Sequence, residues 1–325
     1  MSAPLLSLTD LRVSFHTPNG VVQAVRGVDL EVQPGEMVGV VGESGSGKSV
    51  TFLGMLGLLP GTAKISGSAT VNGTEMVGAT NKVMRSIRGR QVAMIFQDPL
   101  SALNPVYRIG DQIVEMILTH QEMSKSAAQK HAVELLGMVG IPQPDTRARQ
   151  YPHEFSGGMR QRAMIAMALA NDPDVLIADE PTTALDVTVQ AQILEVFQRI
   201  QREMKKAVVI ITHDLGVVAR VADRVQVMYA GRVVERSSVN DLFAAPTHPY
   251  TEGLLSSLPR IGQERLMPIH GSPPNMLQPP PGCGFAARCE HRQDRCESQL
   301  PELKAFKSSM TACIRAEELY GDGAQ

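Results

Sequence analysis

The sequence predicts an α/β protein with a largely parallel sheet, and three observations support this fold class. Short apolar runs alternate with helical stretches over residues 175–228. A strand, a glycine-rich loop and a helix follow one another near residue 40. Hydrophobic residues make up 43% of the 325-residue chain, which is enough to build a real core.

The beginning of the chain is predicted to form strands. Leu5 to Phe15 and Val21 to Val32 alternate apolar and polar residues around a turn at 18–20. An apolar strand from Glu36 to Val41 runs into the glycine-rich loop, and a helix is expected from Lys48. This succession of strand, loop and helix is the context that a phosphate-binding loop requires.

The middle of the chain changes character twice. Asp111 to Thr119 and Lys125 to Val139 carry apolar residues at helical spacing, which predicts a helical insertion at about residues 100–170. Beyond it the α/β alternation returns. Strands are expected at Val175 to Ala178 and Ala207 to Ile211, with a helix at Val187 to Arg202 between them. A further strand is expected at Arg224 to Met228.

The C-terminal part differs in composition. Six prolines between Pro268 and Pro281 exclude a regular helix or a central strand. We therefore predict one domain over residues 1–258, followed by a Pro-rich linker and a cysteine-containing tail over 259–325.

Charge and hydropathy exclude several classes of protein. The net charge is −2, from 31 basic and 33 acidic residues, so no polybasic nucleic-acid binder is expected. Met1 to Asp10 has no basic region followed by an apolar stretch, so we do not expect it to be a signal peptide. No window reaches the roughly 20 apolar residues that span a bilayer. We expect a chain that is soluble by itself and cytosolic, and that could sit on a membrane through a partner.

Residues 42–49 fit the phosphate-loop pattern G-x-x-x-x-G-K-[ST]. Its small residues let backbone N–H groups wrap the phosphates of ATP. Lys48 would reach the β and γ oxygens, and Ser49 would offer a hydroxyl to Mg²⁺. A plain glycine-rich turn is the alternative. The loop residues expected to contact the nucleotide are Gly42, Ser44, Gly45, Gly47, Lys48 and Ser49.

Two carboxylates, Asp179 and Glu180, follow an apolar strand. Asp179 would reach Mg²⁺ through water, and Glu180 is placed to polarise an attacking water molecule. Buried strands often end in acids at a surface loop, so the pattern alone is weak.

Four further features each have a functional and a structural reading. Ser156-Gly157-Gly158 at a helix start could bind an anion or only cap the helix. His213, after an apolar strand, could be catalytic or structural. Gln97 could be a mere strand terminus, and Phe15 either a core aromatic or an adenine-stacking surface.

Taken in order, these landmarks resemble the ATP-binding cassette (ABC) family over about Leu5 to Glu235. The resemblance implies an ABC ATPase core with a helical subdomain, in which two subunits pair head to tail. Each ATP would lie between one phosphate loop and the other subunit's Ser156-Gly157-Gly158, with Asp186 also at the nucleotide. Glu180 would be the catalytic base and His213 would steady the γ-phosphate. Gln97 would assist catalysis and Mg²⁺ binding and line the groove for a membrane permease. Met159 departs from the glutamine of many members.

Later stretches resemble the oligopeptide, dipeptide and nickel importers. They are Tyr151 to Arg162, His248 to Thr251 with Leu254-Leu255, Gly271 to Asn275, and Gly282 to Cys289. The resemblance implies a D-type ATPase subunit at the cytoplasmic face of a bacterial inner membrane. Its partners would be a second, related ATPase, two permease subunits and an extracytoplasmic substrate-binding protein. Peptide is the expected cargo, and nickel or another small solute is the alternative.

All four cysteines lie in the tail, at Cys283, Cys289, Cys296 and Cys313. A disulfide does not suit a cytosolic protein, and the C-x₂₋₄-C knuckle typical of zinc sites is missing. A [4Fe–4S] cluster takes four thiolates. The resemblance favours that cluster, with zinc and no metal as alternatives and His291 as a conceivable extra ligand.

Two other functions fit the sequence less well. A soluble ABC ATPase of translation or DNA repair would carry two cassettes or a long coiled coil, and this chain has neither. The importer-like tail argues against an exporter subunit.

Overall fold

The structure is a computed structural model that describes residues 3–258 and 268–321. The chain divides into two compact units, each built from three stretches. The first unit comprises Met1–Leu6, Val32–Met37 and Thr70–Ile211, and the second comprises Ser7–Glu31, Val38–Ala69 and Thr212–Gln325. The predicted domain boundary at 258/259 borders residues 259–267, which lie outside the described residues, and that division stays a prediction.

The first unit contains three parallel strands in the order β8-β7-β6. They are β6 (Val92–Ile95), β7 (Val175–Asp179) and β8 (Ala207–Thr212). Every residue of β7 is buried, which agrees with its unbroken apolar sequence and with parallel sheets being covered on both faces. β7 therefore ends at the buried carboxylate of Asp179, and Glu180 follows directly after the strand.

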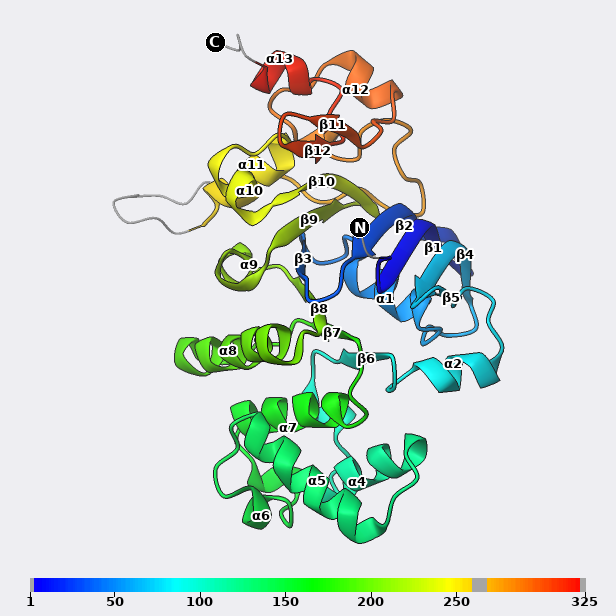
Figure 1. The fold of residues 1–325 in the computed structure, drawn as a ribbon. Coiled ribbons are helices and arrows are strands. Elements are labelled where there is room, and N and C mark those ends of the chain that lie inside the picture. The colour runs from blue at the N-terminus through cyan, green and yellow to red at the C-terminus, as the bar shows by residue number, and fades with distance from the viewer. Residues whose placement is uncertain (1–2, 259–267, 322–325) are drawn as a thin grey trace. The chain divides into compact units, whose positions relative to one another are not determined.

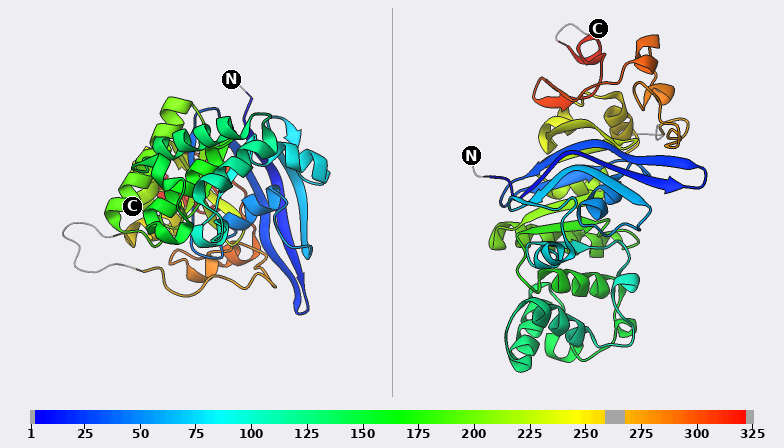
Figure 2. Two further views of the ribbon diagram at one scale, coloured as in Figure 1. Left: turned by 90° about the horizontal axis from the view of Figure 1, so that it is seen from below. Right: turned by 90° about the vertical axis from the view of Figure 1, so that its right-hand side faces the viewer.

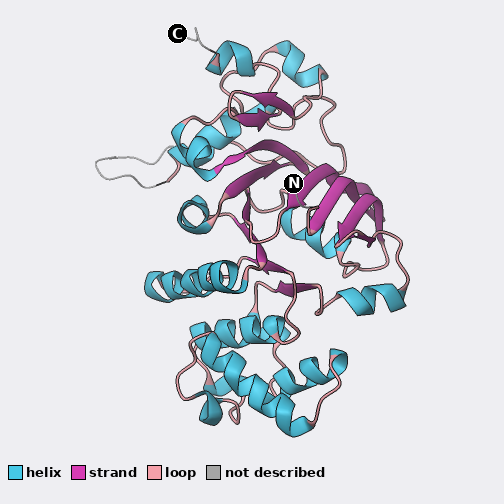
Figure 3. Cartoon of the chain, in the orientation of Figure 1, coloured by secondary structure: helices cyan, strands magenta, loops and turns pink. Residues whose placement is uncertain are grey.

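The helices of the first unit include a cluster without strands, formed by α4 to α7 (Figures 1 and 3). Side-chain caps fix three helix starts, because Ser124, Ser156 and Asp186 each accept a hydrogen bond from the N–H three residues on. The helical segments are α2 (Asn81–Ile87), α3 (Pro99–Ala102), α4 (Ile109–His120), α5 (Lys125–Met138), α6 (Pro144–Arg147), η1 (Pro152–Glu154), α7 (Gly157–Leu169) and α8 (Val187–Met204).

A β-hairpin opens the second unit. β1 (Leu6–Thr17) and β2 (Gly20–Val32) form the long blue ribbon in Figure 2, and the strand order there is β2-β1-β4. β4 (Ala63–Val71) carries the chain into the first unit, where Thr70 and Val71 pair with the short β5 (Thr74–Glu75).

The second unit holds another run of strands, in the order β11-β12-β10-β9-β3. β3 (Met37–Val41) and β9 (Arg224–Tyr229) are parallel, and the remaining neighbours are antiparallel. Beyond these come β10 (Arg232–Ser238), β11 (Lys304–Phe306) and β12 (Ser309–Thr311). The helical segments are α1 (Lys48–Met55), α9 (Leu215–Val221), α10 (Val239–Ala244), α11 (Pro249–Ser256), η2 (Ala286–Arg288), α12 (Asp294–Ser298) and α13 (Ala316–Tyr320).

The cysteine tail is part of the core of the second unit. Strand β12 pairs with β10, with Thr311 opposite Glu235. Phe285 of the tail is buried in the same apolar cluster as Val41, Val227 and Tyr250. Residues 268–281 contain neither helix nor strand, as their prolines predict. The tail is therefore anchored on the fold that supports the phosphate loop.

Within the described ranges, none of the helices combines the length and apolar character needed to cross a membrane.

Candidate functional site

The phosphate loop connects β3 to α1, and its shape depends on glycine. Gly42, Gly45 and Gly47 have φ angles of 152°, 79° and 97°, a region that side chains disfavour. A Cβ atom at Gly42 would lie 2.1 Å from the carbonyl oxygen of Met228, and one at Gly47 would lie 2.6 Å from that of Ala24. The glycines thus allow close backbone packing as well as the turn itself.

Lys48 and Ser49 begin the helix that follows this loop. The Lys48 residue is only 5% exposed, and its Nζ donates to the carbonyl oxygens of Gly42 at 2.7 Å and Glu43 at 3.0 Å. Ser49 is half-buried in the first turn of α1. A helix N-terminus, a lysine ammonium and an adjacent hydroxyl fit the phosphates of ATP with Mg²⁺.

The first unit brings Gln97 and Glu180 together across 83 positions of sequence. Gln97 Nε2 donates to Glu180 Oε2 at 2.9 Å, and the Thr183 hydroxyl donates to the same oxygen at 2.8 Å. Asp179 is buried at the end of β7. Glu180 has a φ of 46°, and its N–H donates to the Ile211 carbonyl. Such a left-handed, non-glycine backbone is uncommon, and conformations of this kind cluster at functional sites.

Ser156, Gly157 and Gly158 lie at the start of α7, a 13-residue helix. Ser156 and Gly157 are exposed, and the Ser156 hydroxyl caps the helix by accepting from Met159 N–H. Asp186 is likewise exposed and caps α8. Helix capping and anion binding are compatible here, because other N–H groups of the first turn of α7 have no partner within the helix.

Some of the predicted nucleotide-site residues belong to the first unit and some to the second. Phe15, the phosphate loop and His213 belong to the second unit, and the other predicted residues belong to the first. Phe15 is half-buried in β1, and His213 is exposed directly after β8. The roles assigned to these individual residues stay predictions.

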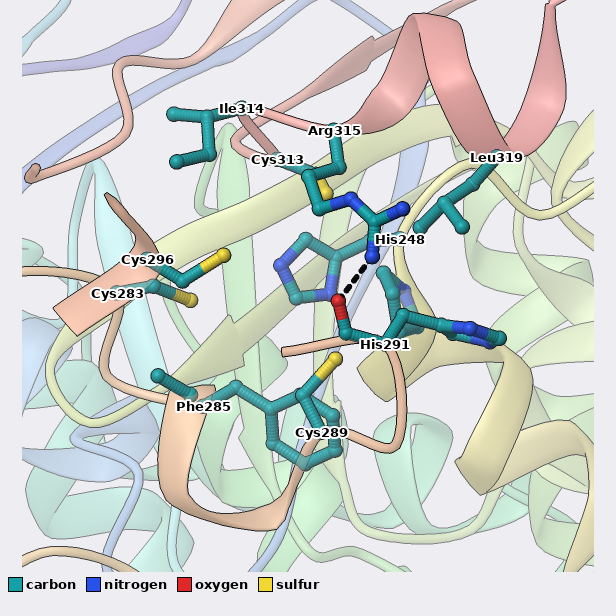
Figure 4. A pocket seen from close by; sticks show the side chains of 12 residues that line it. His248, Cys283, Phe285, Cys289, His291, Cys296, Cys313, Ile314, Arg315 and Leu319 are labelled. Atoms are coloured by element: carbon teal, nitrogen blue, oxygen red, sulfur yellow. Dashed lines mark hydrogen bonds between the residues drawn. The ribbon is translucent and has the colours of Figure 1, made fainter. Parts of the chain in front are cut away.

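The four cysteines line one pocket of the second unit, and their sulfur atoms point into a common space (Figure 4). Each comes from a different place in the tail. Cys283 precedes η2, Cys289 follows it, Cys296 lies in α12 and Cys313 lies between β12 and α13. All four are free of disulfides, and His248 and His291 line the same pocket.

Burial controls the protonation of this pocket. It raises the pKa of Cys283 and Cys289, and it raises that of Cys313 to about 11. It also lowers the pKa of His248 to about 3, and the Nδ1 atom of this neutral imidazole accepts from Tyr250 N–H. These three thiols and the His248 imidazole are therefore neutral at neutral pH. A metal that binds the thiols as thiolates must displace their protons.

The pocket does not have the geometry of a single-ion site. No group of three or more His, Cys, Asp or Glu side chains in the described parts of the chain is arranged to hold one metal ion. Zinc needs its thiolate sulfurs about 2.3 Å from one centre. The zinc alternative stays a prediction beside the cluster.

Sequence reasoning missed two contacts to the phosphate loop. The Tyr250 hydroxyl accepts from Glu43 N–H at 2.8 Å, and Arg288 forms an ion pair with the Glu43 carboxylate. Both residues lie in stretches whose sequence indicates only the resemblance to the importer family. The sequence around a buried tyrosine, or around an arginine between two cysteines, contains no pattern that identifies the residue it contacts.

The fold and these residues define the nucleotide-binding cassette of an ATPase, and comparisons with known proteins specify it further. The ABC transporter family model matches residues 25–183. A second model, the C-terminal region of oligopeptide/dipeptide transporters, matches residues 234–296.

Curated relatives extend the match to most of the chain. The dipeptide transport ATP-binding protein DppD of Bacillus subtilis is 55% identical over 91% of this chain and 90% of its own length. The oligopeptide transport ATP-binding protein OppD of Mycobacterium tuberculosis is 53% identical over 99% of this chain, which spans only 53% of that longer protein. A solved dimeric bacterial ABC transporter cassette is 27% identical with a TM-score of 0.65, over 72% of this chain and 98% of that one.

This chain belongs to the ABC transporter family of ATP-binding proteins, in the branch that carries the oligopeptide/dipeptide C-terminal region. It is an ATPase of that family. The predictions of fold class and family from sequence are confirmed.

Proposed function

We propose that this chain hydrolyses ATP to drive the import of dipeptides or oligopeptides from the cytoplasmic face of a bacterial inner membrane. The observation that carries the proposal is the match of residues 234–296 to the C-terminal region of oligopeptide/dipeptide transporters. The names of its relatives describe dipeptide and oligopeptide transport, which supports the same cargo.

Each nucleotide-site residue has a physical role in this proposal. The phosphate loop and Lys48 hold the phosphates of ATP, and Ser49, Asp179 and Gln97 would hold Mg²⁺. The ion would neutralise charge that develops on the phosphate oxygens. Glu180 accepts a proton from the attacking water. The amide of Gln97 orients the Glu180 carboxylate through a hydrogen bond. His213 steadies the γ-phosphate.

The exposed start of α7 supports a second subunit in the site. A helix N-terminus with Ser156 and Gly157 at the surface can offer its N–H groups to a nucleotide on another cassette. We propose a head-to-tail pair with a related ATPase, docked on two permease subunits. An extracytoplasmic binding protein would deliver the peptide.

We also propose that the four-cysteine pocket holds a [4Fe–4S] cluster. Four free thiols that point into one space supply the ligand set of such a cluster. The described residues include no group of three or more ligands arranged around a single metal ion, so the proposal rests on the four thiols that converge on one space. The ligands would be Cys283, Cys289, Cys296 and Cys313, and the cluster would clip four segments of the tail together.

Anaerobic purification followed by analysis for iron, sulfide and zinc tests the cluster. We expect about four irons and four sulfides per chain with broad absorption near ~400 nm. Cys296→Ser should lower the iron content, and Ser298→Ala is the matched control at an exposed position of the same helix. One zinc per chain, or no metal, would contradict the proposal.

Transport by the assembled complex tests the cargo. The complete transporter in lipid nanodiscs should hydrolyse ATP faster when its binding protein is loaded with a dipeptide or an oligopeptide than when it is empty. Nickel chelates serve as the second arm. If only nickel chelates stimulate ATP hydrolysis, the cargo is nickel and not peptide. If neither stimulates hydrolysis, both proposed cargoes are wrong.

A further inference from the structure

Arg288 joins the cysteine pocket to the phosphate loop within the second unit. It is the last residue of η2 and directly precedes Cys289. Its guanidinium forms a fork on Glu43, the second residue of the loop, with Nη1–Oε2 at 2.6 Å and Nη2–Oε1 at 3.0 Å. The Arg288 side chain is 5% exposed and that of Glu43 is 28% exposed. Solvent therefore screens this pair much less than a surface ion pair.

The remaining donors of Arg288 are also satisfied. They reach the carbonyl oxygens of Ile269 and His270 and the hydroxyl of Tyr229. The guanidinium also lies over the rings of Tyr229 and Phe285. An arginine with every face engaged is held in one position, so it can impose that position on Glu43.

Glu43 touches the part of the loop that handles phosphate. Its carbonyl oxygen accepts from Lys48 Nζ at 3.0 Å and from Ser46 N–H at 3.2 Å. Its own N–H is bound by the Tyr250 hydroxyl. Arg288 and Tyr250 lie outside the phosphate loop and bind the side chain and the N–H of Glu43. They therefore fix the position of the Glu43 carbonyl relative to the Lys48 ammonium.

The cysteines set the position of Arg288 in turn. Ala286 N–H donates a hydrogen bond to the Cys283 carbonyl at 3.1 Å, and Cys289 N–H donates one to the Ala286 carbonyl at 3.2 Å, so η2 lies between two pocket residues. Phe285, on the same turn, lines the pocket and packs against Tyr229 and Tyr250 at ring centroid distances of 5.4 and 5.3 Å. The backbone of Arg288 is therefore tied to two of the cysteines that line the pocket.

We propose that Arg288 is a positioning residue for ATP, which acts through Glu43 on the phosphate loop and couples the four-cysteine pocket to nucleotide binding. The proposal rests on ATP binding at this loop, which belongs to the proposed function. It does not require that the pocket hold a cluster of any particular kind.

Binding of a fluorescent ATP analogue, N-methylanthraniloyl-ATP with Mg²⁺, to the full chain tests the clamp. Arg288→Gln should raise its Kd about tenfold, because the carboxylate loses a charged fork. Arg295→Gln is the matched control, since Arg295 pairs with Glu318 on the surface of the same tail. In the assembled transporter the KM for ATP should rise more than kcat falls. An Arg288→Gln protein that binds like the control would overturn the clamp.

Glu43→Gln keeps the outcome decisive if Arg288→Gln folds poorly, because it breaks the pair from the loop side. Its Kd should rise similarly, and the double variant should be no worse than either single one. If the rise in Kd of the double variant equals the product of the two single rises, the two residues do not act through a shared mechanism. If the unmutated chain fails to bind the analogue, the proposed function falls together with the clamp. Normal binding by the unmutated chain with unaffected variants removes only the clamp.

Cys289→Ser tests the coupling to the pocket. It should raise the Kd severalfold in the unmutated background and add nothing in the Arg288→Gln background. An equal effect in both backgrounds would show that the cysteine acts by another route and would overturn the coupling.

Discussion

The phosphate loop consists of consecutive residues, 42–49, whereas the cysteine pocket collects side chains that are spread over residues 248–319. Backbone angles and close glycine packing shape the loop. The pocket is shaped by side chains from several short segments, few of which are regular elements. A locally built site is sensitive to single backbone changes, while a site assembled from a distance depends on every contact that fixes its segments.

The largest effect is expected at Glu180, where the local motif supplies the chemistry. Glu180→Gln should lower ATP turnover at least about 100-fold, because an amide cannot accept the proton from water. Binding of the ATP analogue should be retained. Steady-state ATPase assays measure the change, with Glu203→Gln on the exposed end of α8 as the control. Unchanged turnover would remove Glu180 from the role of base.

Glycine substitutions separate backbone strain from steric conflict in the loop. Gly47→Ala combines a φ of 97° with a carbonyl 2.6 Å from the new Cβ, so we expect ATP affinity to fall about 30-fold or more. Gly45→Ala has a φ of 79° but nothing within 4 Å, and its loss should be smaller. Equal losses in the two titrations would mean that close packing at Gly47 is unimportant.

The Gln97–Glu180 contact is intermediate between a local site and a site assembled from distant segments, because Glu180 of a local motif contacts a residue 83 positions away. Gln97→Ala should lower turnover about tenfold through loss of a hydrogen bond to a charged group, with ATP affinity within about twofold. Thr183→Val, which removes the other donor to the same oxygen, should have a similar or smaller effect. A large loss of affinity in Gln97→Ala would indicate that the proposed contact of Gln97 with Mg²⁺ outweighs its orientation of Glu180.

The smallest effect tests how the tail is anchored. The Ser309 hydroxyl donates to the buried Ser237 hydroxyl at 2.9 Å. Ser309→Ala should lower the free energy of unfolding by about 1–2 kcal/mol and leave ATP affinity unchanged. Chemical denaturation measures this, with the exposed neighbour change Ser308→Ala as a neutral control. Equal stabilities would indicate that this contact does not anchor the tail.

Local patterns carried most of the fold prediction. The helix after the phosphate loop begins at Lys48 as expected, and the buried strand before Asp179 begins at Val175. Differences at the ends are small. The first strand continues to Thr17 rather than ending at Phe15, because strand pairing extends beyond the apolar alternation. The family and the fold class followed from the order of motifs.

What the sequence could not provide depends on contacts between distant segments. Glu43 and Arg288 are 245 positions apart, and neither has a neighbour that names the other. Convergence of the four cysteines was a hypothesis from composition, and the structure places them around one pocket. The pairing of β12 with β10 had no local signal at all, because three-residue strands carry too little periodicity.

That pairing also determines what a shorter chain would be. A protein ending at Leu258 would lose β12, and β10 would become an open edge with unpaired backbone groups that can recruit strands from other molecules. It would also uncover Glu235, a fully buried carboxyl group whose pKa burial raises, beside Thr247. In such a chain, self-association would compete with folding. In the intact chain, β12 covers this edge, so the segment beyond the linker protects the ATPase against aggregation.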